Sequence, residues 1–275
     1  RMIIMREHNI QRALAALITN PHFALNFAEF KGQITEKLQL TAQEENDLSR
    51  FYADYNHKFC ASTKILSKNR WDNVKQSLPV MCKYIPENKL DKIWRQHLYR
   101  TEFDLLTPKN PLLESIVFGE YALQSSELSQ HEKQIARYEY LRNKVTFEHH
   151  EKFNIYIPKR VGLWEDFDFF NLAIYIDSSC QVHDFESDLF SFMRKQELVN
   201  EKTKIFFFKN LIKEGVGSIK LNSKISLILD MAAAKTNLAA IEKSLEMPSR
   251  KSFVSLIKQL IDCGVLYITL FNEVQ

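Results

Sequence analysis

The chain is poor in cysteine, in glycine and in long apolar runs, and each shortage excludes a class of protein. Its 275 residues include four cysteines and six glycines. Cys60, Cys82, Cys180 and Cys263 lie far apart, without the close pairs typical of zinc sites and redox motifs. We expect reduced thiols and a cytoplasmic protein. No stretch approaches the roughly 18 apolar residues of a membrane span, and the first residues lack the apolar run of a signal peptide.

Signatures of catalysis are missing as well. The sequence has no Gly-rich phosphate loop, no GxSxG elbow and no HExxH helix. His149 and His150 are neighbours, and neighbouring residues on a helix point about 100° apart, which favours a solvated or capping pair over a metal site. Asp184, Glu186 and Asp188 alternate as the ligands of a hard cation could, but no glycine marks a calcium loop, so we favour an acidic surface. We therefore predict no catalytic residue, metal or cofactor in this chain.

The first half of the chain has the apolar periodicity of helices. Thr41 and Glu44 have the spacing of a capping box, in which each side chain accepts a hydrogen bond from the other residue's backbone amide. A further helix is predicted from about Thr63 toward Pro79. These patterns predict an all-helical domain over residues 1–150. Other expected start or stop signals are Asn20-Pro21, Asn110-Pro111, Ser129 with Glu132, and a helix over 87–99.

Beyond residue 150 the pattern changes to short segments rich in Ile, Tyr and Phe, which is typical of strands. Gly215 and Gly217 predict a hairpin between two of them. Three helices should follow, with a final strand at VLYITL. We therefore predict an α+β protein with a winged-helix-like domain over residues 151–275, containing a small antiparallel sheet and three helices. The expected earlier strands are NIYIPKR, NLAIYIDSS, KTKIFFFKN and GSIKLN.

The segment KTKIFFFKN is apolar on both faces of the predicted strand. Ile205 and Phe207 point to one side, and Phe206 and Phe208 to the other. Such a strand is either the centre of a small core or a sheet edge on which something docks. An extended peptide could pair with an open edge through main-chain hydrogen bonds, while apolar pockets select its side chains. The sequence leaves both readings open.

A DNA-binding role is the alternative. Residues 201–275 contain eleven lysines or arginines and seven acids. Polar side chains of the third helix would face away from its core and could contact phosphates and base edges. Against this reading, the segment has one arginine and no strand returning after VLYITL to form a wing. The expected outward-facing residues are Arg250, Lys251, Ser252, Ser255, Lys258 and Gln259.

Four segments resemble the helical domain shared by partner subunits of multinuclear iron oxidases that modify ribosomal peptides. They are IQRALAALITNPHF, LQLTAQEENDLSRF, KILSKNRWDNVKQSLPVMCKYI and LDKIWRQHL. The predicted strands and helices near the end look like the winged-helix recognition element of such systems. The methanobactin-type partner is the nearest match, and the 3-thiaglutamate pathway partner comes second. The helical pattern covers residues 9–100, and residues 101–200 match nothing in it.

The resemblance implies a heterodimer with a TIM-barrel iron oxidase, with the iron in that enzyme and none in this chain. It also implies that the chain binds the leader of a precursor peptide by strand addition, so that the peptide's cysteines become oxazolone and thioamide. The leader would pair with strand 203–208 or 217–221, and aspartate at Phe206 or Phe208 would abolish peptide binding but spare the complex. The implied peptide-binding residues are Ile205, Phe206, Phe207, Phe208, Ile219, Leu221, Phe253, Leu256, Ile257 and Leu260.

Overall fold

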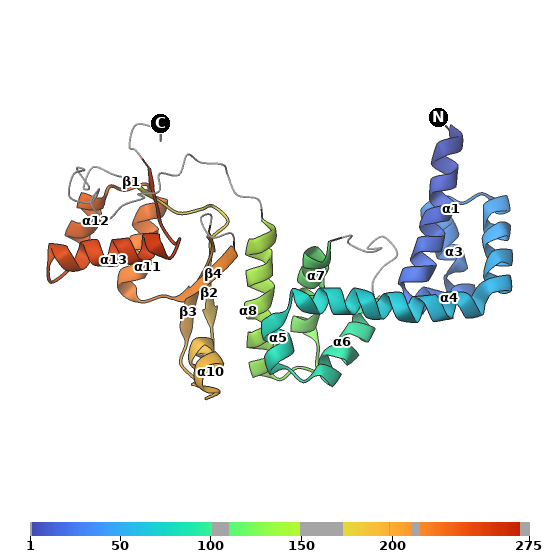
Figure 1. The fold of residues 1–275 in the computed structure, drawn as a ribbon, viewed down its shortest axis with the longest axis horizontal. Coiled ribbons are helices and arrows are strands. Elements are labelled where there is room, and N and C mark those ends of the chain that lie inside the picture. The colour runs from blue at the N-terminus through green and yellow to red at the C-terminus, as the bar shows by residue number, and fades with distance from the viewer. Residues whose placement is uncertain (1, 101–109, 149–172, 198, 211–214, 270–275) are drawn as a thin grey trace. The chain divides into compact units, whose positions relative to one another are not determined.

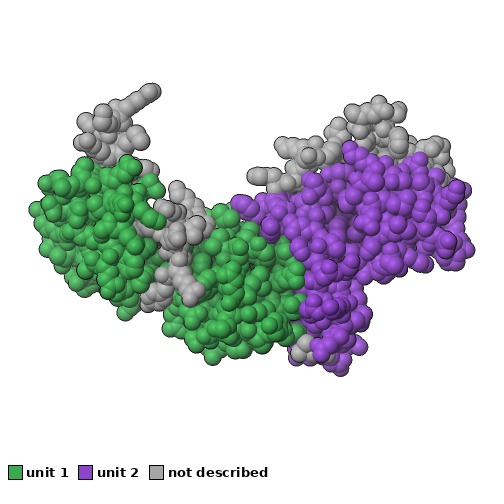
Figure 2. Space-filling view, turned by 180° about the vertical axis from the view of Figure 1, so that it is seen from behind, with its two compact units in different colours: residues 1–143 green, residues 144–275 purple. Residues whose placement is uncertain are grey.

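The computed structural model describes residues 2–100, 110–148, 173–197, 199–210 and 215–269. The chain forms two compact units, residues 1–143 and 144–275 (Figures 1 and 2). The predicted boundary at residue 150 lies close to that division. The first unit contains helices, and the second combines helices with antiparallel strands, which confirms the α+β class. None of the helices in the described ranges has both the length and the apolar character needed to cross a bilayer.

Four helices of the first unit begin at capping residues that the sequence indicates, which are Asn20, Thr41, Asn110 and Ser129. The Asn20 side chain accepts a hydrogen bond from the His22 amide at 2.9 Å, with Pro21 in the first helical position. The capping box of Thr41 and Glu44 is formed in both directions. The helices are α1 (Met2–Thr19), α2 (Pro21–Leu25), α3 (Phe27–Leu38), α4 (Ala42–Gln76), α5 (Pro79–Tyr84), α6 (Glu87–Arg100), α7 (Pro111–Gln124) and α8 (Gln130–Phe147), the last extending into the second unit.

Helix α4 is longer than the sequence predicted. We expected a separate helix from about Thr63, but one helix runs through this position and bends at Tyr55, where φ is −125°. Thr63 is buried, and its hydroxyl donates to the Leu17 carbonyl of α1 at 3.0 Å. Because this hydroxyl has an acceptor on another helix, it does not compete with the backbone of α4.

The second unit contains two small antiparallel sheets. One pairs β1 with β5. These strands lie in the segments NLAIYIDSS and VLYITL, where strands were predicted. The other has the order β2-β3-β4 (Figure 1). NIYIPKR, His149 and His150 lie outside the described residues. The strands are β1 (Ala173–Tyr175), β2 (Gln181–Phe185), β3 (Thr203–Asn210), β4 (Gly215–Lys220) and β5 (Tyr267–Thr269).

Three helices between β4 and β5 provide much of the core of this unit. Their N-caps are the polar side chains of Asn222, Asn237 and Ser249, a residue type that suits this position. After the last helix Gly264 has a φ of +76°, the left-handed conformation that ends helices. The Asn210 side chain donates to the Cys263 carbonyl at 3.0 Å and occupies the space beside that glycine. The helices are α11 (Ser223–Ala233), α12 (Leu238–Ser244) and α13 (Arg250–Asp262).

The acidic stretch before β3 forms regular structure that the sequence did not predict. Asp184 in β2 and Glu186 just after it are exposed, so the interpretation as an acidic surface is confirmed for these two. Asp188 is buried and caps α10 (Leu189–Lys195) by accepting from the amides of Phe190 and Ser191. The described residues contain no cluster of three or more His, Cys, Asp or Glu arranged to hold a metal.

Candidate functional site

Strand β3 is paired on both sides, so no guest strand can pair with it. Phe206 lies opposite Val182 of β2 and opposite Ile219 of β4. The prediction that a leader pairs with strand 203–208 is therefore wrong. The physical reason is β2, which lies in a segment predicted to be an acidic surface and fills the edge that a guest would have used.

Both faces of β3 are also covered. Ile205 and Phe207 are fully buried, and Phe206 and Phe208 are 2% and 4% exposed. The rings of Phe206 and Phe208 stack with centroids 5.8 Å apart and belong to the helical core, while Phe207 contacts Phe185 on the other face. These side chains fill a core, so their predicted place on a groove surface is wrong, and the central-strand reading is correct.

The predicted peptide-binding residues of α13 are also mostly buried. Phe253 and Ile257 are fully buried and Leu260 is 6% exposed, so these three cannot contact a peptide directly. Leu256 is half-buried and packs against the same core cluster. The structure thus brings eight of the ten predicted residues into one cluster, and places Ile205 and Phe207 on the opposite face of the sheet. The half-buried members are Ile219, Leu221 and Leu256.

The outer side of β4 is the candidate site. The Leu221 amide donates to the Lys204 carbonyl at 2.8 Å, so the residues of β4 that bond to β3 are those an even number of positions before Leu221. Because these residues alternate along an antiparallel strand, the main-chain groups of Val216 and Lys220 point away from β3. No strand in the described ranges lies beyond β4. We refer to Val216 and Lys220, with the adjoining Ile219 and Leu221, as the β4 edge.

Apolar side chains border the β4 edge on its core face. Ile219, Leu221 and Ile225 are half-buried and pack against the core that contains Phe206 and Phe208. Each presents part of its surface to solvent and is held in place by the core beneath it. An incoming strand could cover this remaining surface with every second side chain, because alternate residues of a strand face the same side.

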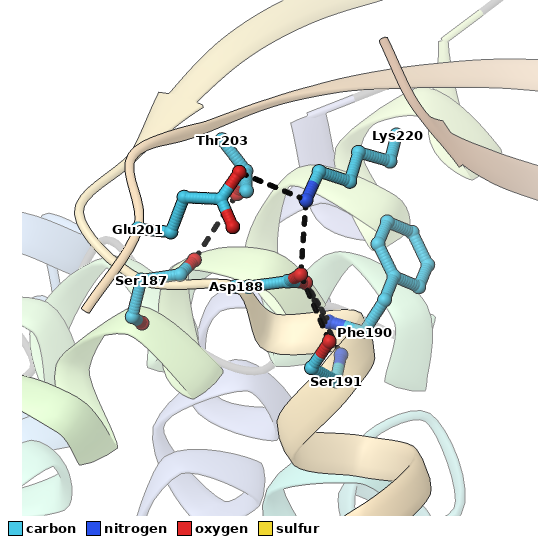
Figure 3. Close-up of polar contacts among 7 residues, drawn as sticks. All are labelled: Ser187, Asp188, Phe190, Ser191, Glu201, Thr203 and Lys220. Atoms are coloured by element: carbon cyan, nitrogen blue, oxygen red, sulfur yellow. Dashed lines mark hydrogen bonds and ion pairs between the residues drawn. The ribbon is translucent and has the colours of Figure 1, made fainter. Parts of the chain in front are cut away.

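On the other face, Lys220 ties the β4 edge to the start of α10 (Figure 3). Its amine lies 3.0 Å from the Asp188 carboxylate and 3.4 Å from that of Glu201. The hydrogen bond and charge of Asp188 raise the pKa of Lys220, with a smaller effect of Glu201. Burial opposes ionisation of Asp188, but hydrogen bonds from Lys220 and Ser191 outweigh it and lower its pKa. Sequence reasoning missed this pair, although Asp188 directly before LFSFMRK has the residue type of an N-cap.

A close contact within the hairpin fixes the shape of β4. The Phe208 ring lies over Gly217, its cross-strand partner, where a β-carbon would overlap the ring. Phe208 is buried and stacked on Phe206, so its ring cannot move aside freely. We expect Gly217→Ala to lower the free energy of unfolding by about 1–3 kcal/mol, as overpacking does. Urea denaturation would measure the loss.

Gly215 of the same strand provides the control for this substitution. An added β-carbon there would meet nothing within 4 Å. Gly215→Ala should therefore change the stability little. Equal losses in the two variants would mean that the strand's backbone, and not the Phe208 ring, requires glycine.

The surface of α13 bears on the DNA-binding alternative. Of the six residues predicted to face outward, Arg250, Lys251, Ser255 and Gln259 are exposed, and Ser252 and Lys258 are half-buried. β5 pairs with β1, which comes earlier in the chain, so this pairing is not the returning strand of a wing. The helix thus offers a polar, mostly basic surface, and the β4 edge offers main-chain groups beside an apolar border.

No protein-family model matches the chain, and no curated protein matches it.

Proposed function

We propose that this chain is a non-catalytic partner subunit that binds the leader of a ribosomal precursor peptide by strand addition at the β4 edge. The observation that carries the proposal is the position of β4 as the last strand of its sheet among the residues that the structure describes, with the main-chain groups of Val216 and Lys220 turned outward. The half-buried Ile219 and Leu221 lie beside them. In this proposal a TIM-barrel iron oxidase is the second subunit and carries the iron.

The chemistry of the edge suits an extended peptide. Main-chain hydrogen bonds would supply affinity irrespective of sequence, and the apolar border would select alternate side chains of the guest. Lys220 places a charge in the strand, a common way in which natural proteins prevent edge strands from pairing with one another. The expected guest is therefore a short strand with apolar residues at every second position.

The proposed contribution to the reaction is positional. A leader held at the β4 edge raises the effective concentration of the precursor's cysteines at the enzyme's iron site. By its resemblance to the methanobactin-type partners, the chain would serve an oxidase that converts those cysteines to oxazolone and thioamide. The residues that do this chemistry would belong to the enzyme.

The substitution Val216→Pro tests strand addition at one atom. Proline removes the Val216 amide hydrogen, which points away from β3, so the β3–β4 ladder stays intact, as at natural edge prolines. One lost main-chain hydrogen bond should weaken the binding of a labelled leader peptide roughly two- to tenfold. Fluorescence anisotropy with a labelled leader-like peptide that has apolar residues at every second position would measure it.

Val216→Ala is the matched control, because it shortens the same side chain and keeps the amide. It should bind the leader within about twofold of the wild type, an effect smaller than the loss of one hydrogen bond. If Val216→Pro binds the leader as tightly as Val216→Ala does, strand addition at this edge is excluded.

A cytoplasmic DNA-binding regulator remains the second candidate, favoured by the exposed Arg250 and Lys251 of α13. Titration with duplex DNA at several salt concentrations separates the two. A regulator would lose affinity steeply as salt rises, because phosphate contacts release counterions. Leader binding through main-chain hydrogen bonds should depend on salt only modestly.

A further inference from the structure

A pocket of about 280 Å³ lies between α1 and α4 in the first unit. Ile10 and Leu14 of α1 are one helical turn apart and line one side. Leu48 and Phe51 of α4 complete the apolar lining. The charged residues at the same pocket are Asp47, Arg50 and Asp54.

The apolar wall of this α1–α4 pocket is held in place from behind. Leu48 is 1% exposed and belongs to the core of the first unit. The Phe51 ring meets the buried Phe59 ring edge-on at 5.6 Å, yet 44% of Phe51 is exposed. A large ring fixed by its neighbours and open to solvent is typical of protein contact sites, because little side-chain freedom is lost when a partner covers it.

The charges of the pocket favour a cation. Arg50 pairs with Asp47 at 2.9 Å. Asp54 takes part in no hydrogen bond or ion pair with any other residue that the structure describes, and the pocket residues together carry one net negative charge. A positive group that enters beside an apolar one would therefore meet an uncompensated carboxylate.

We propose that the α1–α4 pocket docks an apolar side chain that the partner enzyme presents next to a lysine or arginine. The volume lies just below the range of about 300 to 1,000 Å³ of small-molecule sites, which suits one or two side chains. The inference rests on the proposed function, because it gives the helical unit the enzyme as its partner. It adds the location and the chemistry of that contact.

Two small probes test the chemistry on the full chain alone. Phenethylammonium carries a ring beside a positive charge, and 3-phenylpropionate carries a similar ring beside a negative one. Titrations followed by NMR should show the cation binding about two- to fivefold more tightly, the range of an exposed ion pair. In Asp54→Lys the preference should reverse. Glu36→Lys, an equal charge change at an exposed residue of α3 outside the pocket, should keep the wild-type preference.

Equal affinities for the two probes, or the same preference in Asp54→Lys, would overturn the proposal. Co-expression with a TIM-barrel iron oxidase of the methanobactin type provides the second readout. Asp54→Lys should reduce co-purification of the oxidase, while leader binding at the β4 edge stays unchanged. Undiminished co-purification would overturn the docking pocket alone. Failure of the wild-type chain to retain either enzyme or leader would instead overturn the proposed function.

Discussion

Replacing Phe206 by aspartate is expected to unfold the second unit, and any loss of peptide binding would follow from that. The ring is 2% exposed and lies in the core formed with the helices. Truncating a buried phenylalanine costs about 3–5 kcal/mol, and a carboxylate without a partner there adds a desolvation cost. The sum is comparable to the 5–15 kcal/mol by which domains are typically stable. Hydrogen exchange over residues 203–210 and 253–261 should show loss of protection.

Val182→Asp is the control, because it introduces the same carboxylate at an exposed position. Val182 lies directly opposite Phe206 in the sheet but is 50% exposed. A carboxylate there stays hydrated, so the change in stability should be within about 1 kcal/mol. If Phe206→Asp kept full protection in the same segments, the placement of the ring in the core would be contradicted.

This expected result revises the one drawn from the sequence, in which aspartate at Phe206 or Phe208 spared the complex and removed only peptide binding. Both residues now serve as probes of folding. Peptide recognition is better tested at Val216, whose amide points outward without supporting the core. The sequence did not decide whether Phe206 and Phe208 are buried. Because they are, a substitution at either residue measures folding and not peptide binding.

Local signals in the sequence predicted element starts and ends well. Thr41 with Glu44 and Asn237 act as the caps that their residue types indicate, and Gly264 has the left-handed conformation expected of a helix stop. These features depend on a few consecutive residues, so a sequence contains them completely. Two helices were predicted wrongly. The expected boundary near Thr63 lies inside α4, which bends at Tyr55 instead, and α10 was not predicted.

Pairing between strands could not be predicted in the same way. Whether KTKIFFFKN is central or at an edge depends on β2, whose residues QVHDF alternate weakly and lie among acids. The pairing with β3 explains this pattern. His183 and Phe185 lie on the face of Ile205 and are half-buried and buried, whereas Val182 and Asp184 lie on the face of Phe206 but are exposed. For this reason the candidate site is at β4, the second of the two strands that were predicted to pair with a leader.

The ion pair of Lys220 and Asp188 could not be predicted from the sequence either. Both residues are of common types, 32 positions apart, and nothing in the sequence links them. Their contact at 3.0 Å exists because β4 and the start of α10 meet on one face of the sheet. Long-range ion pairs of this kind depend on the tertiary arrangement, so they can be found only once strand order is known.

The first unit should lose stability as the pH falls from about 6.5 to 4, because of His97. This residue is 6% exposed, among the rings of Trp94, Phe118 and Tyr121. Burial, with a smaller contribution from the nearby Arg70 guanidinium, lowers its pKa to about 4. Between the two pKa values the unfolded chain binds a proton that the folded one does not. Linkage then gives a loss of about 3 kcal/mol across this interval, and no further loss from this group below it.

His97→Phe and His97→Gln isolate this contribution, because neither side chain titrates. Their absolute stabilities will differ, since one keeps the ring volume and the other a hydrogen-bonding group. The informative quantity is the stability of the wild type minus that of each variant, from urea unfolding followed by tryptophan fluorescence. It should fall by a similar amount for both variants between pH 7 and pH 4. Parallel profiles for the wild type and both variants would show that His97 binds its proton equally well in the folded and the unfolded chain. That result would contradict the lowered pKa, which follows from the cost of burying an imidazolium beside the Arg70 guanidinium.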